Sequence, residues 1–196
     1  MILLKNKIII IEGSQGVGKG TITNLLRENI PYTTLMRLSG IKDKSYPDKV
    51  FVLRKTELDL LFNSRNSDTT YILDRSFLTE KIYCNLGYKD YDFISETDVL
   101  INYLNDLTFY YDVYIIGLCL NDVNKFSKRL MRNKGIYEHS KFSVDNSIKQ
   151  QKEYIKEINK IKRNYPRINC SLIPADDSIN NVYNNVLKFC GIAGEI

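Results

Sequence analysis

The sequence has no apolar run that approaches the roughly 20 residues needed to span a membrane. It also lacks a basic and apolar leader at its N-terminus, where a glycine-rich motif already begins at residue 13. Internal repeats, low-complexity tracts and linkers rich in proline or glycine are absent as well. We therefore expect a cytoplasmic protein whose 196 residues form a single domain and which has no membrane partner.

Side chains that bind metals or form disulfides are scarce. The four cysteines are Cys84, Cys119, Cys170 and Cys190, and none of them has C-x-x-C spacing. The only histidine is His139, which we interpret as a surface residue. We interpret the cysteines as reduced thiols, which excludes a disulfide framework and a zinc site.

The excess of positive charge is small. The chain carries 28 Lys and Arg against 23 Asp and Glu, which gives a net charge of +5. No separate basic patch interleaved with aromatic residues is evident, so we do not expect a nucleic-acid partner. A protein that grips polyphosphates also needs surplus cations, and the charge therefore favours nucleotide partners.

Residues 7–21, KIIIIEGSQGVGKGT, combine an apolar run with a turn dense in glycine. Glycine tolerates positive φ, and successive amides in such a turn form a concave anion site. The spacing from Gly13 to Lys19 is that of the phosphate-binding loop, or P-loop. Its flanks agree, because residues 8–11 predict a buried strand and residues 22–30 an amphipathic helix. The predicted nucleotide-binding residues are Gly13, Ser14, Gln15, Gly16, Val17, Gly18, Lys19, Gly20 and Thr21.

The loop departs from the usual motif at one position. A Ser or Thr normally follows the lysine and ligates Mg²⁺ through its hydroxyl. Here Gly20 and Thr21 follow Lys19, in a GKGT ending that resembles adenylate kinases. We predict ATP and Mg²⁺ as cofactors, with Thr21 and Asp74 as the candidate metal ligands, since an acid at a strand end can hold the ion through water.

Alternation of strand and helix patterns predicts the fold class. Strands are expected at about 7–12, 32–37, 70–74, 113–120 and 168–174. Helices are expected over 48–64, 95–111, 143–165 and 178–190, the second of them opening on a Ser95-x-x-Asp98 capping box. Such alternation indicates an α/β protein whose parallel sheet is covered by helices on both faces.

Charged residues follow the predicted strands. In a parallel α/β sheet, ligands bind at the carboxyl ends of the strands. Asp74 closes the third strand and Arg75 follows it, while Arg37 closes the second strand. A planar guanidinium suits a phosphate, although a solvated surface arginine is the alternative reading of each.

A second group of cations follows the fourth strand. Arg129 and Arg132 lie in a basic segment at about 126–145, which we predict to be a lid. Arginines on a closing lid supply positive charge during phosphoryl transfer and help to exclude water. A solvated basic helix is the alternative.

The order of these motifs resembles thymidylate kinases and the related deoxynucleoside kinases over nearly the whole chain. The resemblance is carried by the P-loop, LLFNSR, DRSFLTEKIY, KRLMRNK and YPRINCSLIPADDSINNVYNNVL. It implies a three-layer P-loop nucleotide kinase fold, with a five-stranded parallel sheet, helices on both faces and a short lid. Thymidylate kinases have Asp-Arg-Tyr where this chain has Asp74, Arg75 and Ser76, and deoxynucleoside kinases have Glu-Arg-Ser.

The resemblance also implies roles for individual residues. Tyr83 keeps a tyrosine of the thymidylate kinase pattern, whereas Cys84 replaces its glutamine, which puts the base preference in doubt. The implied catalytic residues are Lys19, Arg75, Arg129 and Arg132. The implied substrate-binding residues are Arg37, Phe62, Arg65, Asp74, Arg75 and Tyr83.

Chemistry distinguishes a nucleoside from a nucleoside monophosphate as the acceptor of the phosphate. A nucleoside offers a hydroxyl and needs a carboxylate as general base, whereas a monophosphate is already ionised and needs cations. Deoxynucleoside kinases have a Glu after the second strand, and this chain has Arg37. We therefore predict a kinase that transfers the γ-phosphate of ATP to a (deoxy)nucleoside monophosphate, most simply a pyrimidine such as dTMP.

Alternatives stay open. A deoxynucleoside kinase is the first, and a nucleotide-binding protein without catalysis is the second, since Gly20 weakens the metal site. A regulatory GTPase is disfavoured, because Ser127 stands where the base-reading Asn-Lys-x-Asp motif would need Asp. A homodimer is compatible with every one of these readings.

Overall fold

The computed structural model describes residues 6–37, 47–131 and 143–192. Five parallel strands form one sheet in the order β2-β3-β1-β4-β5, which confirms the predicted α/β class. The strands are β1 (Asn6–Gly13), β2 (Thr33–Arg37), β3 (Thr70–Asp74), β4 (Tyr111–Cys119) and β5 (Asn169–Pro174).

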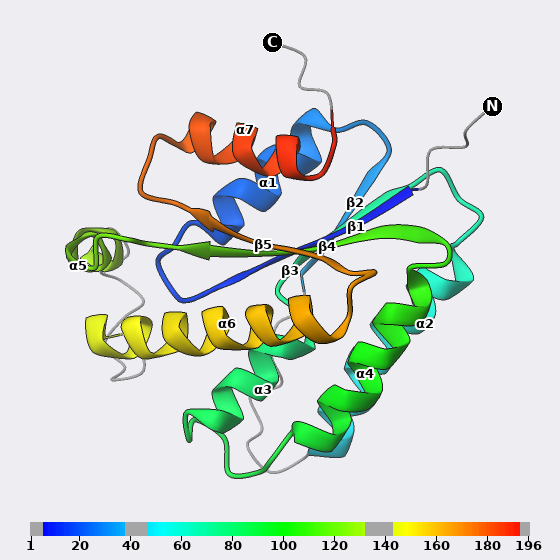
Figure 1. The fold of residues 1–196 in the computed structure, drawn as a ribbon, viewed down its shortest axis with the longest axis horizontal. Coiled ribbons are helices and arrows are strands. Elements are labelled where there is room, and N and C mark those ends of the chain that lie inside the picture. The colour runs from blue at the N-terminus through cyan, green and yellow to red at the C-terminus, as the bar shows by residue number, and fades with distance from the viewer. Residues whose placement is uncertain (1–5, 38–46, 132–142, 193–196) are drawn as a thin grey trace.

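Helices cover both faces of this sheet. They are α1 (Lys19–Asn29), α2 (Pro47–Asn63), α3 (Phe77–Asn85), α4 (Ile94–Leu107), α5 (Asn124–Met131), α6 (Val144–Asn164) and α7 (Ile179–Phe189). Figure 1 shows α1 and α7 on one face and α2, α3, α4 and α6 on the other, so the domain has three layers. Among the described residues, no helix is both long enough and apolar enough to cross a membrane.

The central strand explains why both faces must be covered. Ile8, Ile9, Ile10 and Ile11 are all fully buried, and successive side chains of a strand point to opposite faces. Ile8 and Ile10 pack in the core beneath α2, α4 and α6. Ile9 and Ile11 pack in the core beneath α1 and α7. A strand that is apolar on both sides is typical of a parallel sheet.

Two helix starts differ from the sequence patterns. The patterns do not predict α3, which follows β3 directly and has Ser76 as its N-cap. The prediction of a capping box at Ser95 and Asp98 was wrong. The helix α4 begins at Ile94, its N-cap is Phe93, and no side chain caps it. The Ser95 hydroxyl instead donates to Glu96 at 2.9 Å.

Gly117 of β4 determines how closely α6 approaches the sheet. A Cβ at this position would lie 2.5 Å from Ile158 Cδ1 of α6 and 2.8 Å from Leu172 Cδ2 of β5. The close approach brings Gln151 of α6 to the carboxyl edge, where its amide accepts from Leu120 N at 2.7 Å and donates to Leu120 O at 2.9 Å. The absence of a side chain at Gly117 therefore lets α6 lie close to the carboxyl edge of the sheet.

We predict that Gly117→Ala destabilises the protein by about 1–3 kcal/mol, because an added methyl overpacks the contact between α6 and the sheet. Urea unfolding measures this loss. Thr34→Ala, at an exposed position of the edge strand β2, is the control and should change the free energy of unfolding by less than about 0.5 kcal/mol. Equal stability of Gly117→Ala and wild type would show that α6 does not need this close approach.

Candidate active site

The P-loop connects β1 to α1 through glycines with positive φ. These are Gly13 (φ 140°), Gly16 (φ 82°) and Gly18 (φ 101°). A Cβ on Gly13 would lie 2.5 Å from the carbonyl oxygen of Leu118, so the loop also needs glycine there for close packing. Gly18 is the N-cap of α1, and no side chain caps that helix. The free amides of the helix N-terminus therefore remain available to an anion.

Lys19 is folded back beneath this loop. Its Nζ donates to the carbonyl oxygen of Ser14 at 2.7 Å, and only 6% of the residue is exposed. Burial lowers the pKa of Lys19 well below its ordinary value, and the positive charge of Arg75 lowers it further, while Asp74 and Glu12 act against this shift. The negative charge of a bound phosphate would offset both effects, since an anion beside Lys19 favours its protonated form and raises its pKa.

A cavity of about 640 Å³ opens beside the loop. Residues 15–21 line it together with Arg37, Asp74, Arg75 and Arg129. The structure thus brings most of the predicted site residues to one place at the carboxyl edge of the sheet. Gly13 and Ser14 are buried, and Tyr83 accepts a hydrogen bond from Arg75, which lines the cavity.

Asp74 lies at the end of β3, next to the first turn of α1. Its Oδ2 accepts from Arg37 Nε at 3.1 Å and from Thr23 Oγ1 at 3.4 Å. A Cβ on Gly20 would lie 3.7 Å from the same oxygen. Position 20 therefore faces the predicted metal site, as the usual motif requires, but glycine brings no hydroxyl to it.

The donor set for Mg²⁺ is correspondingly small. The described residues contain no cluster of three or more His, Cys, Asp or Glu that could hold a metal. Mg²⁺ nevertheless suits such a site, because it keeps several waters and commonly binds one or two carboxylates plus substrate phosphates. Asp74 fits this role, and Thr21, which lines the cavity with an exposed side chain, stays a prediction.

Arg37 makes more contacts than the sequence predicts. Besides Asp74, its guanidinium donates to Asn24 Oδ1 at 2.6 Å, Thr23 Oγ1 at 3.2 Å and Gly20 O at 3.3 Å. These contacts join the end of β2 to the first turn of α1. The side chain remains 47% exposed, so it is open to exchange these partners for a ligand.

Arg75 occupies a strained backbone conformation. Its φ is 77°, in the left-handed region, which costs a residue other than glycine about 1–3 kcal/mol. Its amide donates to Ile11 O at 3.1 Å, and its Nη1 donates to the hydroxyl of Tyr83 at 2.8 Å. Arg75 lines the cavity together with Lys19.

Arg129 reaches the site from α5. Its guanidinium donates to Val17 O at 2.9 Å and to Ala175 O, and α5 lies so close that a Cβ on Gly16 would be 3.3 Å from Leu130. Arg129 therefore joins the P-loop to the connection after β5. The other predicted lid arginine, Arg132, lies outside the described residues, as does most of the segment 126–145.

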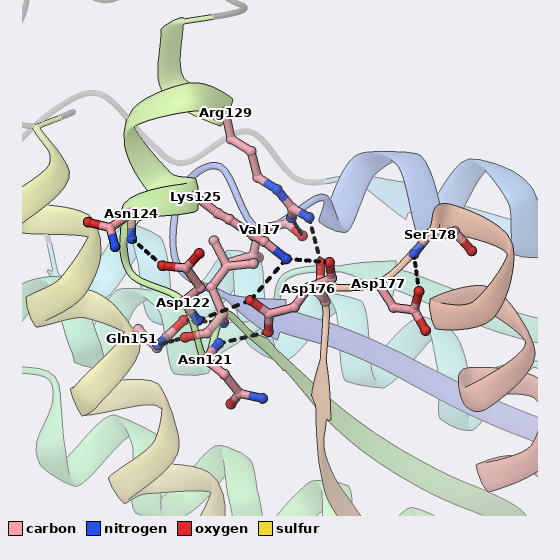
Figure 2. A network of polar contacts seen from close by, with 12 residues as sticks. Val17, Asn121, Asp122, Asn124, Lys125, Arg129, Gln151, Asp176, Asp177 and Ser178 are labelled. Atoms are coloured by element: carbon pink, nitrogen blue, oxygen red, sulfur yellow. Dashed lines mark hydrogen bonds and ion pairs between the residues drawn. The ribbon is translucent and has the colours of Figure 1, made fainter.

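Sequence patterns miss the residue that organises this end of the site. Figure 2 shows the carboxylate of Asp176 between two connections, β4–α5 and β5–α7. It accepts from Asn121 N at 2.7 Å and Asp122 N at 3.0 Å, and Lys125 donates to its backbone oxygen at 2.6 Å. Burial raises the pKa of Asp176, but the two amides and the nearby cations outweigh burial and lower it overall.

The structure does not bring Phe62 and Arg65 to the cavity, which corrects the role implied by the resemblance. Arg65 lies 4.3 Å from the centre of the Phe62 ring and 5.6 Å from that of Tyr110, just before β4 begins. Both residues therefore lie at the amino edge of the sheet. The reason is the chain length, since only residues 66–69 separate Arg65 from β3 and cannot return the chain across the sheet.

With this geometry, the fold is that of the P-loop kinases that act on nucleosides and nucleotides. Thymidylate kinase from Candida albicans is 17% identical, with a TM-score of 0.60 over 95% of this chain and 92% of that one. Deoxyadenosine kinase from M. mycoides is 15% identical, with a TM-score of 0.54 over 94% of this chain and 98% of that one. These likenesses confirm the predicted three-layer kinase fold.

A kinase with another kind of name shares the same fold. Polyphosphate kinase 2 from Arthrobacter aurescens TC1 is 15% identical, with a TM-score of 0.62 over 96% of this chain and 68% of that one. No protein-family model and no curated protein sequence matches the chain. The likeness therefore extends over the whole domain in structure but not in sequence.

We predict that Asp176→Asn lowers the free energy of unfolding by about 1–3 kcal/mol, since it weakens charge-assisted bonds to two amides. The lowered pKa of Asp176 stabilises the fold above the ordinary value of 3.8, and this contribution is lost as the pH falls further. The difference in Tm between wild type and variant should therefore shrink below pH 4.

Asp112→Asn is the matched control, because the side chain of Asp112 is 41% exposed and its ion pair with Lys7 is long, at 3.6 Å. Thermal unfolding from pH 7 to pH 3 compares the three proteins. A Tm difference for Asp176→Asn that stays constant over this range would contradict the assigned role of the carboxylate.

Proposed function

We propose that the protein is an ATP-dependent kinase that phosphorylates a (deoxy)nucleoside monophosphate, with a pyrimidine such as dTMP as the first candidate. One observation carries this proposal. Lys19 and Arg75 line the same cavity, beside the free amides of α1, and the positive charge of Arg75 adds to burial in lowering the pKa of Lys19. Such an arrangement is costly unless an anion binds between the cations.

The donor side follows from the loop. In our proposal, the amides of the P-loop and of the first turn of α1 donate to the β- and γ-phosphates of ATP, and Lys19 leaves Ser14 O to contact them. Arg129 lies over the loop, where it would stabilise charge on the transferred group. The apolar side chains of Ile179 and Val182, with Ala175, line the cavity where the nucleoside part would extend.

Mg²⁺ would neutralise phosphate charge when it binds with ATP. Asp74 would hold it through water, and Thr21 is the residue of the loop that brings a hydroxyl to the lining of the cavity. Arg37 competes for Asp74 at 3.1 Å. Metal binding is therefore expected to shift Arg37 from the carboxylate toward the acceptor.

The acceptor side supports a monophosphate over a nucleoside. Within the described part of the chain, the carboxylates that line the cavity are Asp74 and Asp177, and both already accept hydrogen bonds. Neither is positioned as a free general base for a hydroxyl. Arg37 and Arg75 instead offer two guanidinium groups, which suit a phosphate that is already ionised.

A deoxynucleoside kinase is the alternative, and one observation favours it. Ser76, which follows Arg75, keeps the serine of the Glu-Arg-Ser pattern and caps α3. The fold of deoxyadenosine kinase is also shared. A nucleotide-binding protein without catalysis remains the alternative of another class.

We predict that Lys19→Ala reduces phosphoryl transfer at least about a hundredfold while the fold persists, because transition-state charge loses its stabilisation. ADP release measures the rate, and urea unfolding checks the fold. Lys156→Ala, on the exposed face of α6, is the control and should retain wild-type activity. A Lys19→Ala variant that keeps more than about a tenth of the wild-type rate would contradict the assignment of this segment as a P-loop.

We predict that dTMP is phosphorylated faster than thymidine, and that Arg37→Ala or Arg75→Ala weakens dTMP binding about ten- to a hundredfold, since each removes a charge-assisted contact. ATP affinity should change little. A coupled ADP-release screen over all nucleosides and their monophosphates, followed by calorimetry, tests both statements. Faster turnover of thymidine and deoxycytidine than of dTMP and dCMP would identify a nucleoside kinase instead.

A further inference from the structure

Glu12 is a charged residue in the centre of the molecule, and the sequence patterns assign it no role. It ends the apolar run of β1, directly before Gly13 of the P-loop, and is 0% exposed. Its side chain crosses to the neighbouring strand and meets the turn between β3 and α3. An ionised carboxylate at such depth needs several donors, because burial otherwise favours the neutral acid.

Three donors converge on this carboxylate. Oε1 accepts from Ser76 N and from Ser76 Oγ, both at 2.7 Å. Oε2 accepts from Thr79 Oγ1 at 2.9 Å. Thr79 has one hydroxyl proton, and a carboxylate can only accept, so this proton points to Glu12. The hydroxyl of Tyr154, 2.8 Å from Thr79 Oγ1, must then donate to Thr79.

The resulting chain of bonds joins three elements. It runs from Tyr154 of α6 through Thr79 of α3 to Glu12 of β1, and on to the backbone of Ser76. Every partner is at least nine-tenths buried. The direction of each bond is determined only as long as Glu12 is an acceptor on both oxygens.

Arg75 lies between the two points where this turn is attached to β1. Its own amide donates to Ile11 O at 3.1 Å, and the next amide, that of Ser76, donates to Glu12. Two consecutive amides are thus bound to two consecutive residues of β1. This double attachment flanks Arg75, whose φ is positive and whose side chain lines the cavity.

We propose that Glu12 is a positioning residue, which couples the start of the P-loop to Arg75 and thereby places the acceptor-side guanidinium at a defined distance from Lys19. The inference rests on the proposed function, in which Arg75 binds the acceptor phosphate. It assigns Glu12 no contact with substrate. Its effect is transmitted through Ser76, and the bond from Thr79 orients the carboxylate.

The substitution Glu12→Gln isolates this role because it keeps the shape of the side chain. The amide nitrogen that replaces Oε2 is a donor, so it would face the Thr79 proton and reverse the chain toward Tyr154. The Tyr154 proton then loses its acceptor. A second variant, Thr79→Val, removes the same bond from the opposite side and leaves the two bonds from Ser76 in place.

Calorimetry with dTMP, with inorganic phosphate and with ATP, combined with hydrogen exchange at the Ser76 amide, tests the proposal. For Glu12→Gln we expect dTMP and phosphate to bind about tenfold more weakly, the magnitude of one charge-assisted contact. ATP affinity should change less than about threefold, and the Ser76 amide should exchange faster. Thr79→Val should change the same quantities in the same direction by a smaller factor.

Glu157→Gln is the matched control for a buried carboxylate. Glu157 is 5% exposed, lies on α6 one turn from Tyr154, and pairs with Lys81 at 2.6 Å outside the cavity. It should lower stability without changing the ratio of dTMP to ATP affinity. Equal weakening of dTMP and ATP in Glu12→Gln, or an unchanged Ser76 exchange rate, would overturn the positioning role.

The inference and the proposed function fail differently. If the wild type binds phosphate but not dTMP, the proposed acceptor is wrong, and the phosphate and exchange data still decide the role of Glu12. If the wild type binds dTMP while Glu12→Gln binds it equally well, the proposed function stands and the positioning role is lost.

Discussion

The structure depends on one constraint, which is that the middle strand of a parallel sheet must be buried on both faces. The four isoleucines of β1 meet it, two for each core. Once β1 lies in the centre, β3 and β4 must run beside it in the same direction, so their carboxyl ends share one edge. That edge holds Lys19, Asp74 and Arg75, although more than fifty residues separate the loop from the other two.

The cavity brings several positive charges together. Lys19, Arg37, Arg75 and Arg129 line one cavity, and Asp74 is the main carboxylate among them. Backbone carbonyls and side-chain oxygens hold these cations apart, through Ser14 for Lys19, Asn24 for Arg37 and Val17 for Arg129. Arg37 also pairs with the carboxylate of Asp74, whereas the partners named here for Lys19 and Arg129 are neutral carbonyls. An anion with several charges would therefore be a stronger partner for these cations than a carbonyl oxygen is.

The sequence was sufficient for the elements whose signal is local. The apolar run before Gly13, the loop spacing and the periodicity of the long helices predicted the sheet and the edge at which the cavity lies. Phe62 and Arg65 were misplaced because a motif match ignores how many residues remain before the next strand. Glu12 and Asp176 were missed because a single acid carries no pattern, and its partners come from distant segments.

The strand order also affects how fast the chain can fold. β1 emerges first during synthesis, yet its neighbours are formed by Tyr71–Asp74 and Tyr111–Leu118, so most of the chain must be made before the strand is paired. Non-local parallel pairing is slow to form, and an unpaired run of β-branched residues invites association with other chains. The isoleucines that stabilise the folded sheet therefore stay unpaired until β3 and β4 have been made, and during that time this run can associate with other chains.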